Sequence, residues 1–79
     1  MITAERLAEL TNYTAGALTE ALADSGYMDE TFLTARFLGI TNGGQFCYQV
    51  QFEDEDQGLM FSKVFLTYNP THGTVIAEY

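Results

Sequence analysis

The segment FCYQVQF, residues 46–52, decides the fold class of this chain. Its large apolar side chains alternate strictly with Cys47 and two glutamines. Successive side chains of a β-strand point to opposite faces, so this alternation predicts a strand with one buried face and one face in water. We therefore expect an antiparallel sheet with a single apolar face.

Three further strands are expected around this segment. Residues 32–40 precede it, and residues 59–68 and 74–79 follow it. Asn42-Gly43 is a strong hairpin signal, because both central positions of the tightest hairpin turns need a positive φ. Short connections favour strands that are neighbours in a meander.

The first third of the chain has a helical pattern. Thr3 is a candidate N-cap for a helix over residues 4–10, and Thr14 for a second helix. Leucines and alanines then recur at helical spacing until Ser25-Gly26, a typical helix stop. The sequence predicts one α+β domain over residues 1–79, helical over 3–31 and β over 32–79, with two helices packed on a four-stranded antiparallel meander.

Composition restricts the class of protein. Eleven acids face three bases in 79 residues, giving a net charge of −8. Cys47 is the single cysteine, so no internal disulfide can form, which suits a reducing cytosol. We find no signal-peptide pattern and no apolar run of membrane-spanning length, and we expect a cytoplasmic monomer. The net charge has two interpretations: it keeps the protein soluble, or it forms a surface that binds a basic partner.

Motifs for catalysis or metal binding are missing from the sequence. His72 lies in a Pro- and Gly-rich loop, and Cys47 has no neighbouring base to activate its thiol. Asp54, Asp56 and Gly58 suggest the start of a calcium loop, but the twelfth position is a phenylalanine where a bidentate Glu is needed. We predict no enzyme activity, no metal and no cofactor.

Residues 6–22 resemble a helix-turn-helix DNA-binding motif in their leucine and alanine spacing. A recognition helix needs Lys, Arg, Asn or Gln to reach phosphates and base edges, and residues 14–24 contain none of these. With a net charge of −8, DNA would be repelled. We interpret this pattern as helix packing and expect no direct contact with nucleic acid.

The acids form clusters, and these are the candidate binding residues. Two pairs have the four-residue spacing that places both side chains on one helix face, one pair follows the second helix, and four acids are consecutive in an expected turn over residues 53–58. The candidates are Glu5, Glu9, Glu20, Asp24, Asp29, Glu30, Glu53, Asp54, Glu55 and Asp56. Carboxylates about 5–6 Å apart on a helix have a spacing comparable to that of phosphates on a nucleic-acid strand. The four-acid block can also be read as a solvated hairpin turn.

In size, acidity, α+β pattern and lack of a catalytic motif, the chain resembles small phage-encoded anti-CRISPR proteins of the DNA-mimic type. The resemblance implies a non-enzymatic inhibitor that binds the basic, DNA-binding surface of a CRISPR effector complex in the host cytoplasm and blocks target DNA. The alternative is an acidic adaptor or antitoxin-like protein that packs on a basic partner without mimicking DNA.

Overall fold

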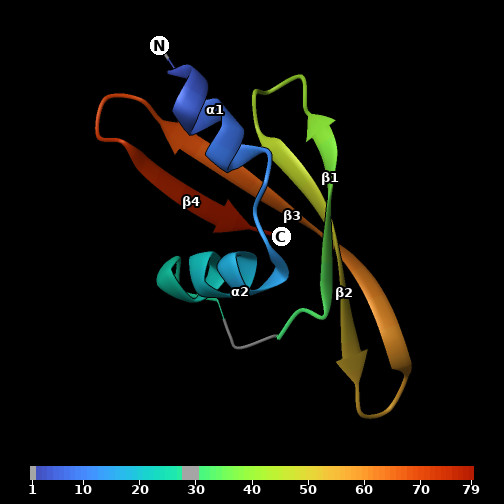
Figure 1. The fold of residues 1–79 in the computed structure, drawn as a ribbon. Coiled ribbons are helices and arrows are strands. Elements are labelled where there is room, and N and C mark those ends of the chain that lie inside the picture. The colour runs from blue at the N-terminus through green and yellow to red at the C-terminus, as the bar shows by residue number, and fades with distance from the viewer. Residues whose placement is uncertain (1, 28–30) are drawn as a thin grey trace.

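Four antiparallel strands form one sheet in the chain order β1-β2-β3-β4 (Figure 1). This computed structural model describes residues 2–27 and 31–79. The α+β class, the N-terminal helices and the antiparallel four-stranded sheet are confirmed. The elements are α1 (Ala4–Leu10), α2 (Ala15–Asp24), β1 (Thr34–Ile40), β2 (Phe46–Asp54), β3 (Gly58–Asn69) and β4 (Thr74–Glu78).

The alternation in β2 separates the two faces of the sheet. Tyr48 is paired with Phe37 of β1 and Val64 of β3, and all three belong to the apolar inner face. The residues that form the buried core are Leu10, Leu18, Leu22, Phe32, Phe46, Tyr48, Val50, Val64, Leu66 and Ala77. Leucines from both helices therefore share one core with the inner face of the sheet.

Both helices begin, and α2 ends, at residues that the local sequence predicts. The side-chain oxygens of Thr3 and Thr14 each accept a hydrogen bond of 3.1 Å, from the backbone N–H groups of Arg6 and Ala17, which satisfies one free donor of each first turn. Gly26 follows α2 with a φ of 93°, a left-handed conformation that costs glycine nothing. The predicted N-caps and the helix stop are confirmed.

Tyr48 joins the sheet to the segment between the helices. Its hydroxyl donates a hydrogen bond of 2.5 Å to the carbonyl oxygen of Leu10 and accepts one of 3.0 Å from the N–H of Tyr13. A second link joins α2 to the last strand, where the N–H of Ala77 donates to the Ser25 hydroxyl at 3.0 Å. Polar groups at the helix ends are thereby satisfied beside the core.

The first hairpin has a different turn from the one predicted. Thr41 and Gln45 close a three-residue loop, in which the Thr41 N–H donates a hydrogen bond of 2.8 Å to the Gln45 carbonyl. The residue of this loop with positive φ is Gly44, at 82°. Asn42 and Gly43 do not adopt positive φ, so the prediction that they are the central pair of a two-residue turn was wrong. A third consecutive small residue lets the loop lengthen by one and place glycine in the left-handed position.

The strand boundaries also shift. The first strand begins at Thr34, not at residue 32, and β2 continues through Asp54 into the expected acidic turn, so the turn itself covers residues 55–57. The outer face of the sheet is less exposed to solvent than predicted. Cys47 points to this face, opposite to Tyr48, yet it is only 8% exposed.

Candidate functional site: the acidic clusters

The acids of α1 are partly neutralised by a neighbouring arginine. Glu5 and Glu9, the α1 pair, are both exposed, but the Arg6 guanidinium lies 2.8 Å from the Glu9 carboxylate. Arg6 also donates to the Gly73 carbonyl at 2.7 Å and lies 5.2 Å above the Tyr68 ring. Hydrogen bonding to Tyr68 and then to Glu9 raises the pKa of Arg6. The arginine thus ties α1 to the β3–β4 end of the sheet, which leaves Glu5 as the free charge of this pair.

The acids of α2 have no cationic partner among the described residues. Glu20 and Asp24, the α2 pair, are exposed and one helical turn apart. Within residues 2–27 and 31–79 the Arg6–Glu9 contact is the one ion pair, so neither member of the α2 pair is neutralised. Leu18 and Leu22 of the same helix are buried, which fixes the helix with this pair facing solvent.

The third group of acids lies at the tip of the β2–β3 hairpin. Glu53, Asp54, Glu55 and Asp56, the tip cluster, lie at the end of β2 and in the following turn. Three of them are exposed, whereas Asp54 is half-buried and accepts hydrogen bonds from the N–H groups of Asp56 at 2.8 Å and Gln57 at 3.2 Å. Asp54 therefore shapes the turn, as Asp side chains commonly do, and the other three carboxylates are free to contact a partner.

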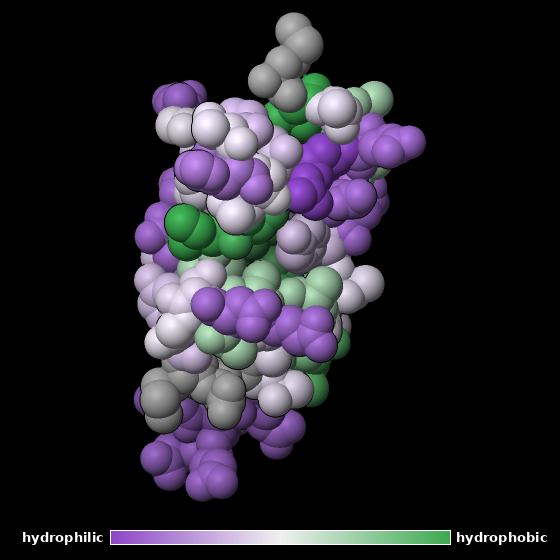
Figure 2. All heavy atoms as spheres, turned by 90° about the vertical axis from the view of Figure 1, so that its left-hand side faces the viewer, coloured by the Kyte–Doolittle hydropathy of each residue, from purple (hydrophilic) through white to green (hydrophobic). Residues whose placement is uncertain are grey.

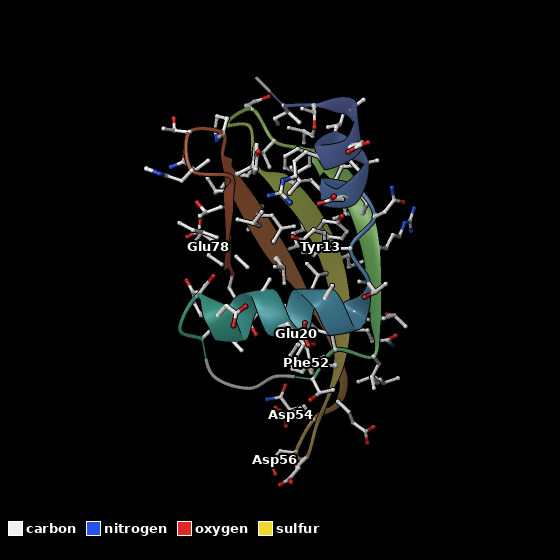
Figure 3. The ribbon with its side chains drawn as sticks, turned by 60° about the vertical axis from the view of Figure 1, so that its left-hand side comes forward. Tyr13, Glu20, Phe52, Asp54, Asp56 and Glu78 are labelled. Carbon is white, nitrogen blue, oxygen red and sulfur yellow. The ribbon has the colours of Figure 1, made fainter. Side chains whose placement is uncertain are left out.

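The acidic groups follow the long axis of the molecule. Figure 3 shows Glu20 on α2 and Asp54 and Asp56 at the hairpin that extends past this helix. Glu78, on β4, lies on the side of α2 away from the hairpin tip. On the face shown in Figure 2, hydrophilic side chains gather at the hairpin end, in a belt at the height of α2 and at the opposite end of the molecule. The most hydrophobic surface of this face lies on the side of the belt away from the hairpin end. The molecule measures 43 × 23 × 20 Å, so the charges are displayed along an elongated body. Asp29 and Glu30 lie outside the described residues.

The residues examined for catalysis remain apart in the structure. His72 is exposed in the β3–β4 loop, and Cys47 is buried on the outer face of the sheet. Among the described residues no group of three His, Cys, Asp or Glu side chains is close enough to hold a metal ion. Over the same residues, no helix is both long and apolar enough to cross a membrane.

One surface was not anticipated from the sequence. The outer face of the sheet carries large exposed side chains, namely Leu38, Leu59, Phe61 and Ile76, together with the two remaining bases, Arg36 and Lys63. A shallow hollow on this face is lined in part by Leu38, Cys47 and Lys63. The available signal was the strand over residues 59–68, which has apolar residues at both odd and even positions instead of on one face.

The chain matches no protein-family model, no curated protein and no solved structure. The surface chemistry of the molecule is therefore what indicates its function.

Proposed function

We propose that this protein is a non-enzymatic inhibitor that binds the basic, nucleic-acid-binding surface of a partner protein and takes the place of DNA there. The observation that carries the proposal is the set of free carboxylates. The α2 pair and the exposed members of the tip cluster have no ion-pair partner among the described residues. Uncompensated charge destabilises a small domain, so its retention on fixed elements favours a role in binding.

The rigidity of the carboxylates supports mimicry over simple solubility. Solubility requires net charge, but it does not require that the charges hold fixed positions. The α2 pair is fixed by a helix anchored through buried leucines, and the tip cluster follows directly on a paired strand. Carboxylates held in place lose less entropy when they meet Lys and Arg side chains, and charge-assisted bonds to those groups are strong.

The resemblance to anti-CRISPR proteins points to a CRISPR effector complex as the partner, in the cytoplasm of the host cell. Such a complex holds nucleic acid in a positively charged channel, which is the chemistry that a row of carboxylates fits. An inhibitor seated there excludes target DNA by occupancy, without any chemical step.

A specific observation favours a second candidate function. The exposed apolar residues of the outer sheet face, such as Phe61 at 62% exposure, suit an adaptor or antitoxin-like protein that packs on a basic partner. The two candidates differ in their dependence on salt. Binding through the acidic clusters weakens steeply as ionic strength rises, whereas apolar packing changes little.

The test starts with capture of partners from a bacterial lysate by the tagged chain, at low and at high salt, followed by competition with double-stranded DNA. We expect the captured protein to bind DNA, and DNA and this chain to displace each other. If DNA fails to displace the chain and high salt leaves capture unchanged, the mimicry proposal is wrong.

A matched pair of variants then separates position from net charge. Glu20→Gln with Asp24→Asn neutralises the α2 pair, and Thr71→Lys with His72→Lys adds two cations, with His72 counted as neutral, at exposed positions of the β3–β4 loop. Both changes move the formal net charge from −8 to −6, since each adds two positive units. We expect about a tenfold or greater loss of affinity for the first variant only. Equal losses for both would show that only total charge matters.

A further inference from the structure

The outer face of the sheet differs in charge from the rest of the molecule. Two of the three bases, Arg36 and Lys63, lie on it, and of the nine described acids only Glu53 and Glu78 do so by strand register. Glu78 also accepts a hydrogen bond of 2.8 Å from Gln45. On a protein with a net charge of −8, this is the surface that two copies can bring together with least repulsion.

The same face exposes large apolar side chains, whose burial against a partner would be favourable. Phe61 is 62% exposed, Leu59 57% and Ile76 55%, on a sheet whose other face forms the core. Large apolar side chains that gather on one exposed face mark an interaction site. Aligned stacking of two such faces is the usual way in which sheets bury them.

The charges on this face are arranged symmetrically about one residue pair. Gln51 of β2 is paired with Phe61 of β3. Gln49 lies two residues from Gln51 along β2 in one direction. It is paired with Arg36 of β1 and with Lys63 of β3, and these three residues form a basic row across the strands. Two residues to the other side lies Glu53, paired with Leu59. Both groups are thus about 7 Å from the central pair, in opposite directions along the strands.

We propose that a second copy of this chain covers the outer face, in a two-fold symmetric dimer centred on Phe61. The two-fold axis lies between the two stacked sheets and runs perpendicular to the strands, level with the Gln51–Phe61 pair. Rotation about this axis places residues on one side of the pair in one copy opposite residues on the other side of the pair in the second copy. It places the Glu53 carboxylate of each copy over Gln49 of the other, between that copy's Arg36 and Lys63. Phe61 then meets Phe61, as a self-complementary interface requires.

This inference does not rest on the proposed function. The α2 pair lies on a helix whose buried leucines pack with the inner face of the sheet, so a dimer through the outer faces leaves this pair exposed in both copies. Of the exposed tip-cluster acids, the dimer uses Glu53 and leaves Glu55 and Asp56, in the turn, free. The expectation of a monomer, drawn from the sequence, would be replaced.

The test is sedimentation equilibrium over a wide range of protein concentration, with the wild type and a charge swap. We expect a concentration-dependent dimer for the wild type and at least a tenfold weaker one for Lys63→Glu alone or Glu53→Lys alone. The double variant keeps the net charge of the wild type and restores pairing, so its dimer should return to within about threefold of the wild type. Glu55→Lys, which makes the same charge change in the turn, is the control for Glu53→Lys.

An apolar variant tests the centre of the interface. Phe61→Gln should weaken the dimer at least tenfold, whereas Leu7→Gln, at an exposed position of α1, should not. A chain that stays monomeric at every concentration overturns the proposal, and so does a dimer that is insensitive to both Phe61→Gln and Lys63→Glu. If Phe61→Gln does not unfold cooperatively, the charge swap decides alone.

Discussion

Removal of the Tyr48 hydroxyl tests how the helices are held to the sheet. In Tyr48→Phe the ring stays in the core, but the carbonyl of Leu10 and the N–H of Tyr13 both lose their partner. Each hydrogen bond contributes about 0.5–1.5 kcal/mol net, so the free energy of unfolding should fall by about 2 kcal/mol. A domain of this size has about 4–12 kcal/mol in all, and the loss corresponds to a decrease in Tm of about 8–16 °C.

The measurement is thermal unfolding followed by circular dichroism at neutral pH. Tyr27→Phe is the matched control, because Tyr27 is 39% exposed and does not belong to the buried core, and its ring centroid lies 5.4 Å from that of Tyr79. This variant should stay within about 0.5 kcal/mol of the wild type. A Tm for Tyr48→Phe that also lies within 2–3 °C, or about 0.5 kcal/mol, of the wild type would refute the bridging role of the hydroxyl.

The pH dependence gives a second readout of the same group. Burial raises the pKa of Tyr48 above its ordinary value of 10, and burial likewise raises that of Tyr13. A raised pKa stabilises the folded state fully below about pH 10, and that stability is lost as the pH rises toward the folded-state pKa. The wild type should therefore lose stability above pH 10. Tyr48→Phe should lose less stability over the same range, and the loss that remains in this variant is due to Tyr13.

Three further variants probe local features. Arg6→Gln removes an ion pair, a hydrogen bond to a distant carbonyl and a cation–π contact, and should lower the midpoint of urea unfolding relative to the wild type. In the same titration Gly16→Ala should raise the free energy of unfolding by about 0.4–1 kcal/mol, since a methyl group there meets open space within a helix, whereas Gly58→Ala should lower it by about 1 kcal/mol because the φ of that residue is 79°. Cys47 should react with a thiol reagent far more slowly in the native protein than in denaturant, and equal rates would contradict its burial.

The parts of the fold that were predictable depend on short stretches of sequence. The alternation over residues 46–52 fixes a strand by itself, and Thr3 and Thr14 cap helices through atoms only three residues away. The first turn was mispredicted because Asn42-Gly43-Gly44 can form two turns of different length. Local sequence does not choose between them, and the strand pairing does.

Long-range contacts could not be predicted. The hydrogen bond from Arg6 to the Gly73 carbonyl spans 67 residues, and no pattern in the sequence predicts that an arginine of the first helix contacts that loop. The burial of Cys47 likewise depends on the strands paired with β2, and the sequence does not show which side chains those strands place beside it. The acidic clusters were found because charge spacing is visible in the sequence, but the pairing of Glu9 with Arg6 and the turn-forming bonds of Asp54 appear only in the structure.

The hydrogen bond between Ser25 and Ala77 joins two segments that are synthesised at different times. The helix that ends before Ser25 leaves the ribosome early, yet its partner in β4 follows 52 residues later. At about 5–20 residues per second, that separation corresponds to roughly 3–10 s of translation. During this interval the leucines of α2 have no completed sheet to cover them. A nascent chain stalled before β4 has emerged from the ribosome should therefore remain sensitive to protease and bind chaperones, and emergence of β4 should complete the sheet.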